Sequence, residues 1–258
     1  MTQTLRVATE NGITTITLAR PERRNAISSR MMDELAQALE TASASAATRL
    51  LVLTGEGKAF CAGMDLEMLQ KAASQSVDET LDDSRRMART FLALYRFPKP
   101  TIAAVKGAAI AGGCGLATFC DFTIAAPEAK FGYTEVRIGF LPALVSVFLK
   151  RQIGEKQAND LLLTGRIIDA AEALRMGLIT EVVAERPLME RVQEIAAMLV
   201  ANSPESLTRT KRLLRAFTYE DVDREIELAI RENAAIRKTT DFREGVASFL
   251  EKRAPKWS

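Results

Sequence analysis

This sequence of 258 residues contains no histidine. The absence excludes Ser-His-Asp and Cys-His nucleophile arrangements, histidine-ligated metals and any imidazole acid or base near neutral pH. Cysteine is scarce as well, because Cys61, Cys114 and Cys120 are an odd number without CxxC spacing. That pattern predicts three small buried thiols rather than a disulfide framework or a zinc site. We therefore expect no metal, and proton transfer falls to carboxylates, lysine, tyrosine, cysteine or water.

Charge of one sign and long apolar runs are also missing. Lysine and arginine total 35 against 33 aspartates and glutamates, so no overall field attracts nucleic acid or a membrane, although a local basic patch can still hold a phosphate. No apolar run approaches the roughly 20 residues that span a bilayer, and the first residues lack the basic segment and apolar core of a signal peptide. We expect a cytoplasmic protein with neither nucleic acid nor a membrane as partner.

Alternation and helical spacing together predict an α/β fold. "LRVATENGITTITLA" alternates apolar and polar residues around Asn11 and Gly12, which predicts a hairpin. Apolar residues at helical spacing follow, and Ser28 or Ser29 is expected to cap that helix. "RLLVLTG" and "TIAAVKG" predict buried strands, whereas residues 64–97 predict helices with a charged portion that lines a pocket.

The end of the chain has a different character. Three amphipathic helices are predicted in "PESLTRTKRLLRAF", "YEDVDREIELAIRENAAIRK" and "TDFREGVASFLEKR". Because they lie beyond the last predicted strand, they resemble a lid or an oligomerisation element. We predict a core at residues 1–201 and a C-terminal helical region at residues 202–258.

"AIAGGCGLATFCD" has three glycines within four positions, at the start of what otherwise reads as a buried helix. A phosphate loop does not fit because no Lys-Ser or Lys-Thr pair follows Gly112, and Gly113 and Gly115 lack the third glycine of a dinucleotide fingerprint. An oxyanion hole fits better, since a helix N-terminus has unpaired N–H groups that a reacting carbonyl can approach over glycine. "GKAFCAGMDLEML" predicts a second such turn, with Asp65 capping its helix. Close packing of helix on strand is the alternative reading of both turns.

Four segments, "RPERRNAI", "GKAFCAGMDL", "KGAAIAGGCGLATFCD" and "AKFGYTEVRIGFLP", resemble successive signatures of the crotonase, or enoyl-CoA hydratase/isomerase, family. The resemblance continues to "EGVASFLEKR" and covers nearly the whole chain. It implies a spiral core of repeated ββα units, a C-terminal helical oligomerisation region, and a homo-trimer or a dimer of trimers. It also implies an acyl-CoA substrate, with coenzyme A as part of the substrate and no permanently bound cofactor.

The matching motif positions imply where the chemistry lies. Members of the family hold the thioester oxygen with two backbone amides while an enolate forms, and the matching donors are Met64 and Gly112. Glu135 in "FGYTE" matches the later of two glutamates that many hydratases use, and Gly115 stands at the position of the earlier one. Burial beside an acyl chain raises the pKa of a carboxyl group toward neutrality, so we expect Glu135 to carry the proton.

A second acid is not evident in the sequence. "IGFLPALVSVFL" offers only Ser146 as a polar residue, which does not support a nucleophilic aspartate. Asp82 or Asp83 is a candidate helper, although a solvated surface position suits both charges better. Cys61 and Cys114 flank the predicted amides but have no histidine or nearby cation to form a thiolate. A single acid favours a double-bond shift, whereas hydration is work usually shared by two.

Further contacts with substrate and coenzyme A are implied by the same matches. Arg23 and Arg24 are candidate phosphate contacts, because arginine's planar fork suits phosphate oxygens. Phe249 and Lys252 match residues that reach coenzyme A bound by a neighbouring subunit, and Gly113 leaves room for close packing or backbone approach. The full set is Arg23, Arg24, Ala26, Ala62, Asp65, Gly113, Gly115, Phe249 and Lys252.

The sequence therefore predicts an enoyl-CoA hydratase/isomerase that stabilises a thioester enolate and moves protons with one glutamate. Hydration and a double-bond shift both remain open. Two alternatives use the same scaffold: an acyl-CoA thioester hydrolase, and an acyl-CoA-binding protein without catalysis.

Overall fold

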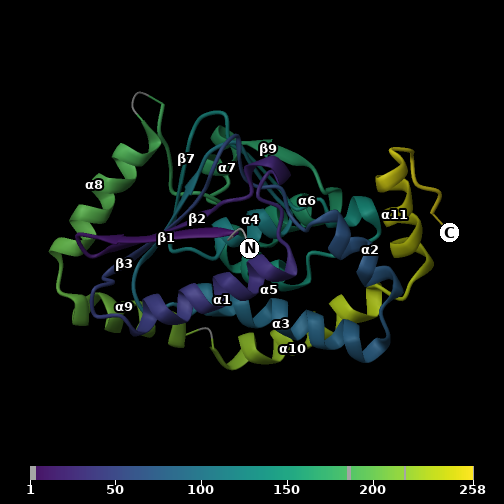
Figure 1. The fold of residues 1–258 in the computed structure, drawn as a ribbon, viewed down its shortest axis with the longest axis horizontal. Coiled ribbons are helices and arrows are strands. Elements are labelled where there is room, and N and C mark those ends of the chain that lie inside the picture. The colour runs from purple at the N-terminus through teal and green to yellow at the C-terminus, as the bar shows by residue number, and fades with distance from the viewer. Residues whose placement is uncertain (1–3, 185–186, 218, 258) are drawn as a thin grey trace.

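The computed structural model describes residues 4–184, 187–217 and 219–257, and it has a mixed α/β architecture (Figure 1). The predicted hairpin is confirmed: β1 (Leu5–Glu10) pairs antiparallel with β2 (Ile13–Leu18). Asn11 and Gly12 connect the two strands with φ angles of 48° and 81°. Positive φ at both turn residues is the geometry that matches the twist of a two-residue hairpin.

The larger sheet continues from this hairpin with parallel strands. Its strand order is β1-β2-β3-β5-β7-β10. The added strands are β3 (Leu50–Gly55), β5 (Thr101–Val105), β7 (Phe122–Ala125) and β10 (Glu181–Val182). β3 and β5 read as apolar runs because they are buried between the elements on both of their faces.

A second, smaller sheet lies beside the first, with strand order β4-β6-β8-β9. Its strands are β4 (Ala59–Cys61), β6 (Ala108–Ile110), β8 (Lys130–Gly132) and β9 (Ile167–Asp169). Each of β3, β5 and β7 in the larger sheet runs directly into β4, β6 or β8 in the smaller one, and a helical segment follows. This repetition is the predicted spiral of ββα units, which is confirmed.

Helices cover the spiral and connect its turns. Their bounds are η1 (Pro21–Arg23), α1 (Ser29–Ala44), α2 (Leu66–Ser74), α3 (Val77–Tyr95), α4 (Gly112–Thr118), η2 (Glu135–Ile138), α5 (Ala143–Ile153), α6 (Glu155–Thr164), α7 (Ala170–Arg175) and α8 (Leu188–Ala201). The predicted caps are correct, because Ser28 accepts a hydrogen bond from the N–H of Met31 and Asp65 accepts one from the N–H of Glu67.

The three predicted C-terminal helices are α9 (Pro204–Ala216), α10 (Tyr219–Ile236) and α11 (Thr240–Glu251). α10 packs along α3 and α5, and α11 packs against α2 and η2, at the opposite end of the molecule from α8 and α9 (Figure 1). The last two helices therefore fold over elements of their own chain that come from the spiral. The division at residue 202 stays a prediction.

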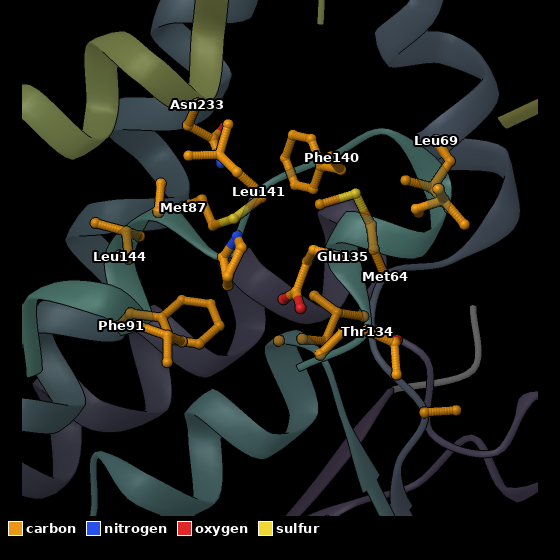
Figure 2. Close-up of a pocket in the computed structure, with 18 of the residues that line it drawn as sticks. Met64, Leu69, Met87, Phe91, Thr134, Glu135, Phe140, Leu141, Leu144 and Asn233 are labelled. Atoms are coloured by element: carbon orange, nitrogen blue, oxygen red, sulfur yellow. The ribbon is translucent and has the colours of Figure 1, made fainter. Parts of the chain in front are cut away.

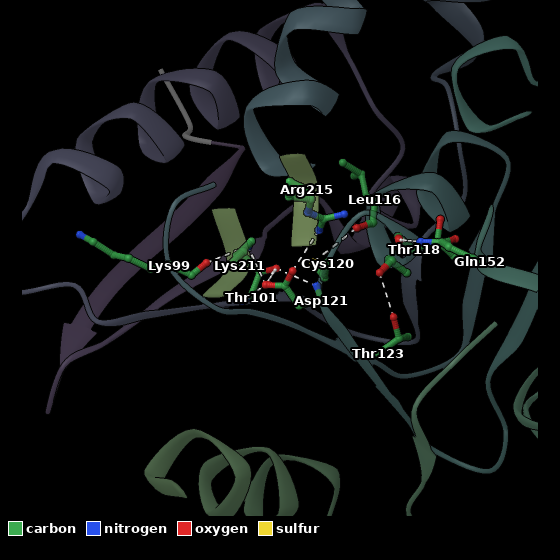
Figure 3. A network of polar contacts seen from close by, with 11 residues as sticks. Lys99, Thr101, Leu116, Thr118, Cys120, Asp121, Thr123, Gln152, Lys211 and Arg215 are labelled. Carbon is green, nitrogen blue, oxygen red and sulfur yellow. Dashed lines mark hydrogen bonds and ion pairs between the residues drawn. The ribbon is translucent and has the colours of Figure 1, made fainter. Parts of the chain in front are cut away.

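A partly buried charge network connects α9 to the spiral (Figure 3). Asp121, just before β7, accepts hydrogen bonds from both the N–H and the hydroxyl of Thr101 at 2.9 and 3.0 Å. Its two oxygens also meet Lys211 at 2.6 Å and Arg215 at 3.0 Å, both from α9. The guanidinium carbon of Arg215 stands 3.6 Å from the ring centre of Tyr95. One carboxylate thus links two strands of the larger sheet to the C-terminal region.

The main hydrophobic core fills the space between the sheets and the helices that cover them, with Ile16, Leu35, Leu53, Phe60 and Leu116 among its fully buried members. The three cysteines are free and buried, as predicted. Among the helices within the described residues, none combines the length and the apolar character needed to cross a bilayer.

Candidate active site

A pocket opens between α3, α4, η2, α5 and α10, with a volume of about 130 Å³ (Figure 2). Since one water needs roughly 10–15 Å³ of such space, the pocket has room for several waters or for part of a small ligand. Its wall is mostly apolar. The lining residues are Ile27, Ala62, Met64, Leu69, Met87, Phe91, Ala111, Gly112, Thr134, Glu135, Ile138, Phe140, Leu141, Pro142, Ala143, Leu144, Val145, Asn233 and Phe249.

Glu135 is the one carboxylate among the described residues that line this pocket. It begins η2 after the short strand β8, and only 8% of its surface is exposed. Its Oε2 atom is buried and has no hydrogen-bond partner within the described part of the chain. Burial in apolar surroundings raises the pKa of Glu135 to about 7. The carboxyl group, which points into the pocket in Figure 2, is therefore suited to exchange protons near neutral pH.

Gly112 places one backbone amide at the pocket wall. It is the first residue of α4, so its N–H has no acceptor within the helix. Ala111, which precedes it, has φ 52° and ψ −126°, a conformation that is sparsely populated for a residue with a side chain. The N–H of Ala111 donates to the carbonyl of Gly132 at 2.7 Å, which holds this strained residue in place. Strained backbone that is held by hydrogen bonds is typical of active sites and ligand-binding sites, where it fixes the direction of a functional group.

Met64 offers a second amide. Ile27 pairs with the two residues on either side of Met64. The N–H of Ile27 donates to the carbonyl of Gly63 at 2.7 Å, and the N–H of Asp65 donates to the carbonyl of Ile27 at 2.9 Å. The intervening N–H of Met64 donates to no acceptor among the described residues. Gly63 has φ 93°, and a Cβ atom added there would stand 3.1 Å from the Cβ of Ala111. The two glycine turns therefore touch, and both present an unpaired amide near one pocket.

The other two glycines of α4 have different neighbours. A Cβ atom at Gly113 would lie 2.3 Å from the carbonyl oxygen of Cys61, so this glycine serves the close packing of α4 on β4 and does not line the pocket. A Cβ atom at Gly115 would lie 3.0 Å from Val145 and 3.2 Å from Phe91. Apolar side chains thus fill the space next to the position where many hydratases carry their first glutamate. Neither Gly113 nor Gly115 is among the residues that line the pocket.

The segment "RPERRNAI" is organised by two residues that the sequence reading overlooked. Asn25 is fully buried, accepts a hydrogen bond from the N–H of Arg20 at 2.9 Å, and donates to the carbonyls of Glu56 and Ala59. Arg20 donates to the carbonyl of Ala26 at 2.7 Å and forms an ion pair with Asp65 at 2.9 Å. The available signal was an asparagine directly after the charged run "RPERR", because asparagine tolerates the left-handed backbone that Asn25 adopts at φ 55°.

Three residues predicted to contact the substrate, Asp65, Ala26 and Ala62, take part in these bonds or in neighbouring ones. Asp65, only 5% exposed, caps α2, pairs with Arg20 and is not among the pocket-lining residues. The carbonyl of Ala26 is already bonded to Arg20, and its N–H donates to the carbonyl of Arg23. Ala62 does line the pocket, and its N–H donates to the carbonyl of Arg24 at 3.0 Å.

The predicted cationic contacts lie outside the pocket, since no described lysine or arginine lines it. Arg23 and Arg24 are exposed on the loop at η1, and Arg23 lies 3.9 Å from Glu67. Lys252 is exposed at the end of α11. Phe249, 52% exposed, lines the pocket of its own chain, and its predicted contact with coenzyme A of a neighbouring subunit stays a prediction.

Neither helper acid of the sequence analysis reaches the pocket. Asp82 is exposed and pairs with Arg85 at 3.8 Å, and Asp83 pairs with Arg237 at 2.8 Å. Burial raises the pKa values of the Cys61 and Cys114 thiols to about 12, so both stay protonated and are not nucleophiles at neutral pH.

Comparisons with known proteins agree with this arrangement. The family model for enoyl-CoA hydratase/isomerase matches residues 8–258. The chain belongs to the enoyl-CoA hydratase/isomerase family. A Thermus thermophilus protein with a provisional enoyl-CoA hydratase name is 44% identical, over 97% of this chain and 100% of that protein. A crotonyl-CoA hydratase of Syntrophomonas wolfei is 33% identical, over 95% of this chain and 94% of that protein.

The crystal structure of an enoyl-CoA hydratase from Mycobacterium avium superposes with a TM-score of 0.88 at 34% identity, and it covers 100% of both chains. Membership in this crotonase family supports an enzyme that acts on an acyl-CoA. Family motifs identify Glu135 and the two glycine turns, but they do not reveal what stands opposite Glu135. Phe91, Val145 and Asn233 escaped the sequence analysis because each sits in an ordinary helical pattern without a motif.

Proposed function

We propose that this protein is an enoyl-CoA isomerase-type enzyme that shifts a double bond by moving one proton on Glu135. One observation carries the proposal: a single buried carboxyl group with a pKa of about 7 faces a pocket whose other described lining side chains are apolar except for Thr134 and Asn233. Phe91 and Val145 occupy the space beside Gly115 where a second acid would otherwise project. The pocket thus contains a group that removes and returns a proton, and no described carboxylate to direct a water.

In the proposed reaction Glu135 takes up one proton and gives it back, so the enzyme ends each turnover in its starting protonation state. The thioester oxygen of a 3-enoyl-CoA accepts hydrogen bonds from the N–H groups of Met64 and Gly112. Glu135 takes a proton from C2, and the electron pair of that C–H bond moves into the thioester to form an enolate conjugated with the C3–C4 double bond. Glu135 then returns the proton to C4, which leaves the double bond between C2 and C3. Each fixed amide donor typically contributes about 100- to 1,000-fold to such a rate.

Hydration of a 2-enoyl-CoA is the second candidate. Relatives with hydratase names favour it, and the pocket volume of about 130 Å³ leaves room for a water. Hydration requires that a water be oriented at C3 while a proton reaches C2, which two acids usually share. With Glu135 as the one carboxylate among the described residues of the pocket, we expect hydration to be the slower reaction.

Contacts outside the pocket complete the proposal. Arg23, Arg24 and Lys252 are exposed cations that can meet the phosphates of coenzyme A, whereas Ala62 flanks the thioester. We propose a homo-trimer or a dimer of trimers, in which Lys252 reaches the coenzyme A of a neighbouring subunit. The cation contacts predict a dissociation constant that rises with salt.

Two substrates and one variant test this function. The wild-type protein is incubated with 3-hexenoyl-CoA and with crotonyl-CoA, while enoyl absorbance and free thiol are followed separately. Rising enoyl absorbance with 3-hexenoyl-CoA supports isomerisation, and falling absorbance with crotonyl-CoA supports hydration. Release of thiol indicates a hydrolase, and no change with either ester indicates a protein that only binds acyl-CoA.

Glu135→Gln keeps the size of the side chain and removes the proton carrier. We expect it to lose turnover and still bind octanoyl-CoA. If Glu135→Gln retains turnover, another group carries the proton and the proposed mechanism is wrong.

A further inference from the structure

Asn233 places a buried polar side chain in the otherwise apolar wall of the pocket. It belongs to α10, is 5% exposed, and lies on the same side of Glu135 as Met87 and Leu144, opposite Met64 and Leu69 (Figure 2). An amide buried among apolar side chains is costly unless its donors and acceptor are satisfied. The hydrogen-bond partners of Oδ1 and Nδ2 therefore indicate why the amide is buried here.

The orientation of the amide is fixed by its neighbours. The Oδ1 atom of Asn233 accepts hydrogen bonds from the guanidinium of Arg237 at 2.8 Å and from the hydroxyl of Ser84 at 2.9 Å. Arginine has only donors, so the atom of the amide that faces Arg237 must be the oxygen. The Nδ2 group is consequently turned away from Arg237.

The Nδ2 group donates to no acceptor among the described residues. It is also not completely enclosed by protein atoms, so a ligand can reach it. Asn233 is a pocket-lining residue and Figure 2 draws its amide at the edge of the pocket, so Nδ2 is the part of the side chain that is left to meet a ligand there. Figure 2 shows the amide directed to the side of the pocket that Met87 and Leu144 form.

The charges behind Asn233 are compensated. Arg237 is 1% exposed and forms an ion pair with Asp83 at 2.8 Å, while its guanidinium carbon lies 5.6 Å from the ring centre of Phe140. The ion pair holds Arg237 in place as a support for the amide. The pocket itself therefore meets a neutral donor rather than a positive charge.

We propose that Asn233 is a specificity-determining residue that binds an uncharged oxygen on the acyl chain, such as a ketone, ester or hydroxyl oxygen. The proposal rests on the proposed function, in which the thioester lies at Met64 and Gly112 and the acyl chain extends past Glu135 toward Met87 and Leu144. A plain alkyl chain at this place removes water from the Nδ2 donors without replacing its hydrogen bonds. An acceptor on the chain satisfies them.

Binding of unreactive saturated esters separates this recognition from the chemistry. Octanoyl-CoA is compared by calorimetry with three isomers that carry one ketone at C5, C6 or C7. Wild-type protein is expected to bind at least one ketone isomer about 10-fold or more tightly than octanoyl-CoA, a difference that matches one satisfied buried donor.

Asn233→Asp is the decisive variant. It keeps an oxygen for Arg237 and Ser84 but replaces the donors by an acceptor, so the ketone preference should fall to about 1-fold while octanoyl-CoA still binds. Asn159→Asp, at an exposed position of α6, controls for the added charge and should keep the preference. Thermal unfolding verifies that both variants fold.

Three outcomes would overturn the assignment: equal binding of all esters by the wild type, a ketone preference that survives in Asn233→Asp, or tighter binding of a chain that ends in a carboxylate. Failure of the wild type to bind any of the esters, octanoyl-CoA included, would contradict the proposed function itself. Binding of octanoyl-CoA without a ketone preference would contradict only the role of Asn233.

Discussion

Replacing Glu135 by glutamine should make the stability of the protein less dependent on pH. In the folded state, burial raises the pKa of Glu135 from its ordinary value near 4.5 to about 7. The ionised carboxylate therefore destabilises the fold, because its Oε2 atom has lost water and gained no donor among the described residues. Glutamine has nearly the same shape and carries no charge at any pH.

The sign follows from proton binding. Between pH 4.5 and pH 7 the folded state holds the proton of Glu135 while the unfolded state has lost it. The free energy of unfolding of the wild type therefore falls as pH rises through this window and is level above it. The full shift corresponds to about 3 kcal/mol, of which about 2.5 kcal/mol is lost between pH 5 and pH 8.

Urea unfolding at pH 5 and pH 8 measures the effect. At equal protomer concentration, Glu135→Gln should gain about 2.5 kcal/mol relative to the wild type when the pH is raised. Glu67→Gln, whose side chain is 81% exposed, controls for the loss of one carboxylate. If the difference between Glu135→Gln and the wild type is the same at both pH values within about 0.5 kcal/mol, the carboxyl group is not desolvated and the reasoning fails.

Four further changes test other parts of the structure. Gly112→Pro removes the N–H at the first position of α4, where the helix itself does not use it, so kcat should fall about 100- to 1,000-fold below that of Gly112→Ala, which keeps the N–H, with thermal unfolding verifying that both variants fold; equal rates would refute the donor role. Gly115→Glu combined with Val145→Ala should raise crotonyl-CoA hydration about 100-fold, followed by loss of enoyl absorbance, whereas Gly115→Ala with Val145→Ala should not. Asp121→Ala should lower the free energy of unfolding by about 3 kcal/mol in urea, and an unchanged value would show that apolar contacts alone hold α9. Lys252→Gly, which suits the left-handed backbone there, should raise the dissociation constant of acyl-CoA most at low salt, and an unchanged constant would exclude the phosphate contact.

Much of the fold could be predicted from local patterns. Turn chemistry predicts the hairpin at Asn11 and Gly12, capping predicts the helix start at Ser28, and helical spacing predicts the three C-terminal helices. Each of these signals comes from residues that are close together in the sequence. How the short strands of the second sheet pair was not predictable in this way. β4, β6 and β8 are each only three residues long, and their pairing follows from the closure of the spiral.

The site was predictable only where a motif carries it. Glu135 and Gly112 lie in recognisable segments, but their environment comes from residues far along the chain. Gly115 illustrates the limit, since its sequence position shows a missing acid and not the Phe91 and Val145 side chains that take up the space. Asn233 is a similar case: the atoms that orient it belong to α3 and to the next turn of α10.

A single acid at Glu135 is consistent with the way charge moves during the proposed reaction. Before proton transfer, the negative charge lies on a carboxylate whose Oε2 has no donor among the described residues. Afterwards Glu135 is neutral, and the charge lies on the thioester oxygen, between the N–H groups of Met64 and Gly112. The same pocket thus disfavours the charge at its starting place and stabilises it at its destination. A second carboxylate at position 115 would put another charge into this space and oppose the ionisation of Glu135, so the apolar side chains at Gly115 keep Glu135 ready to accept a proton.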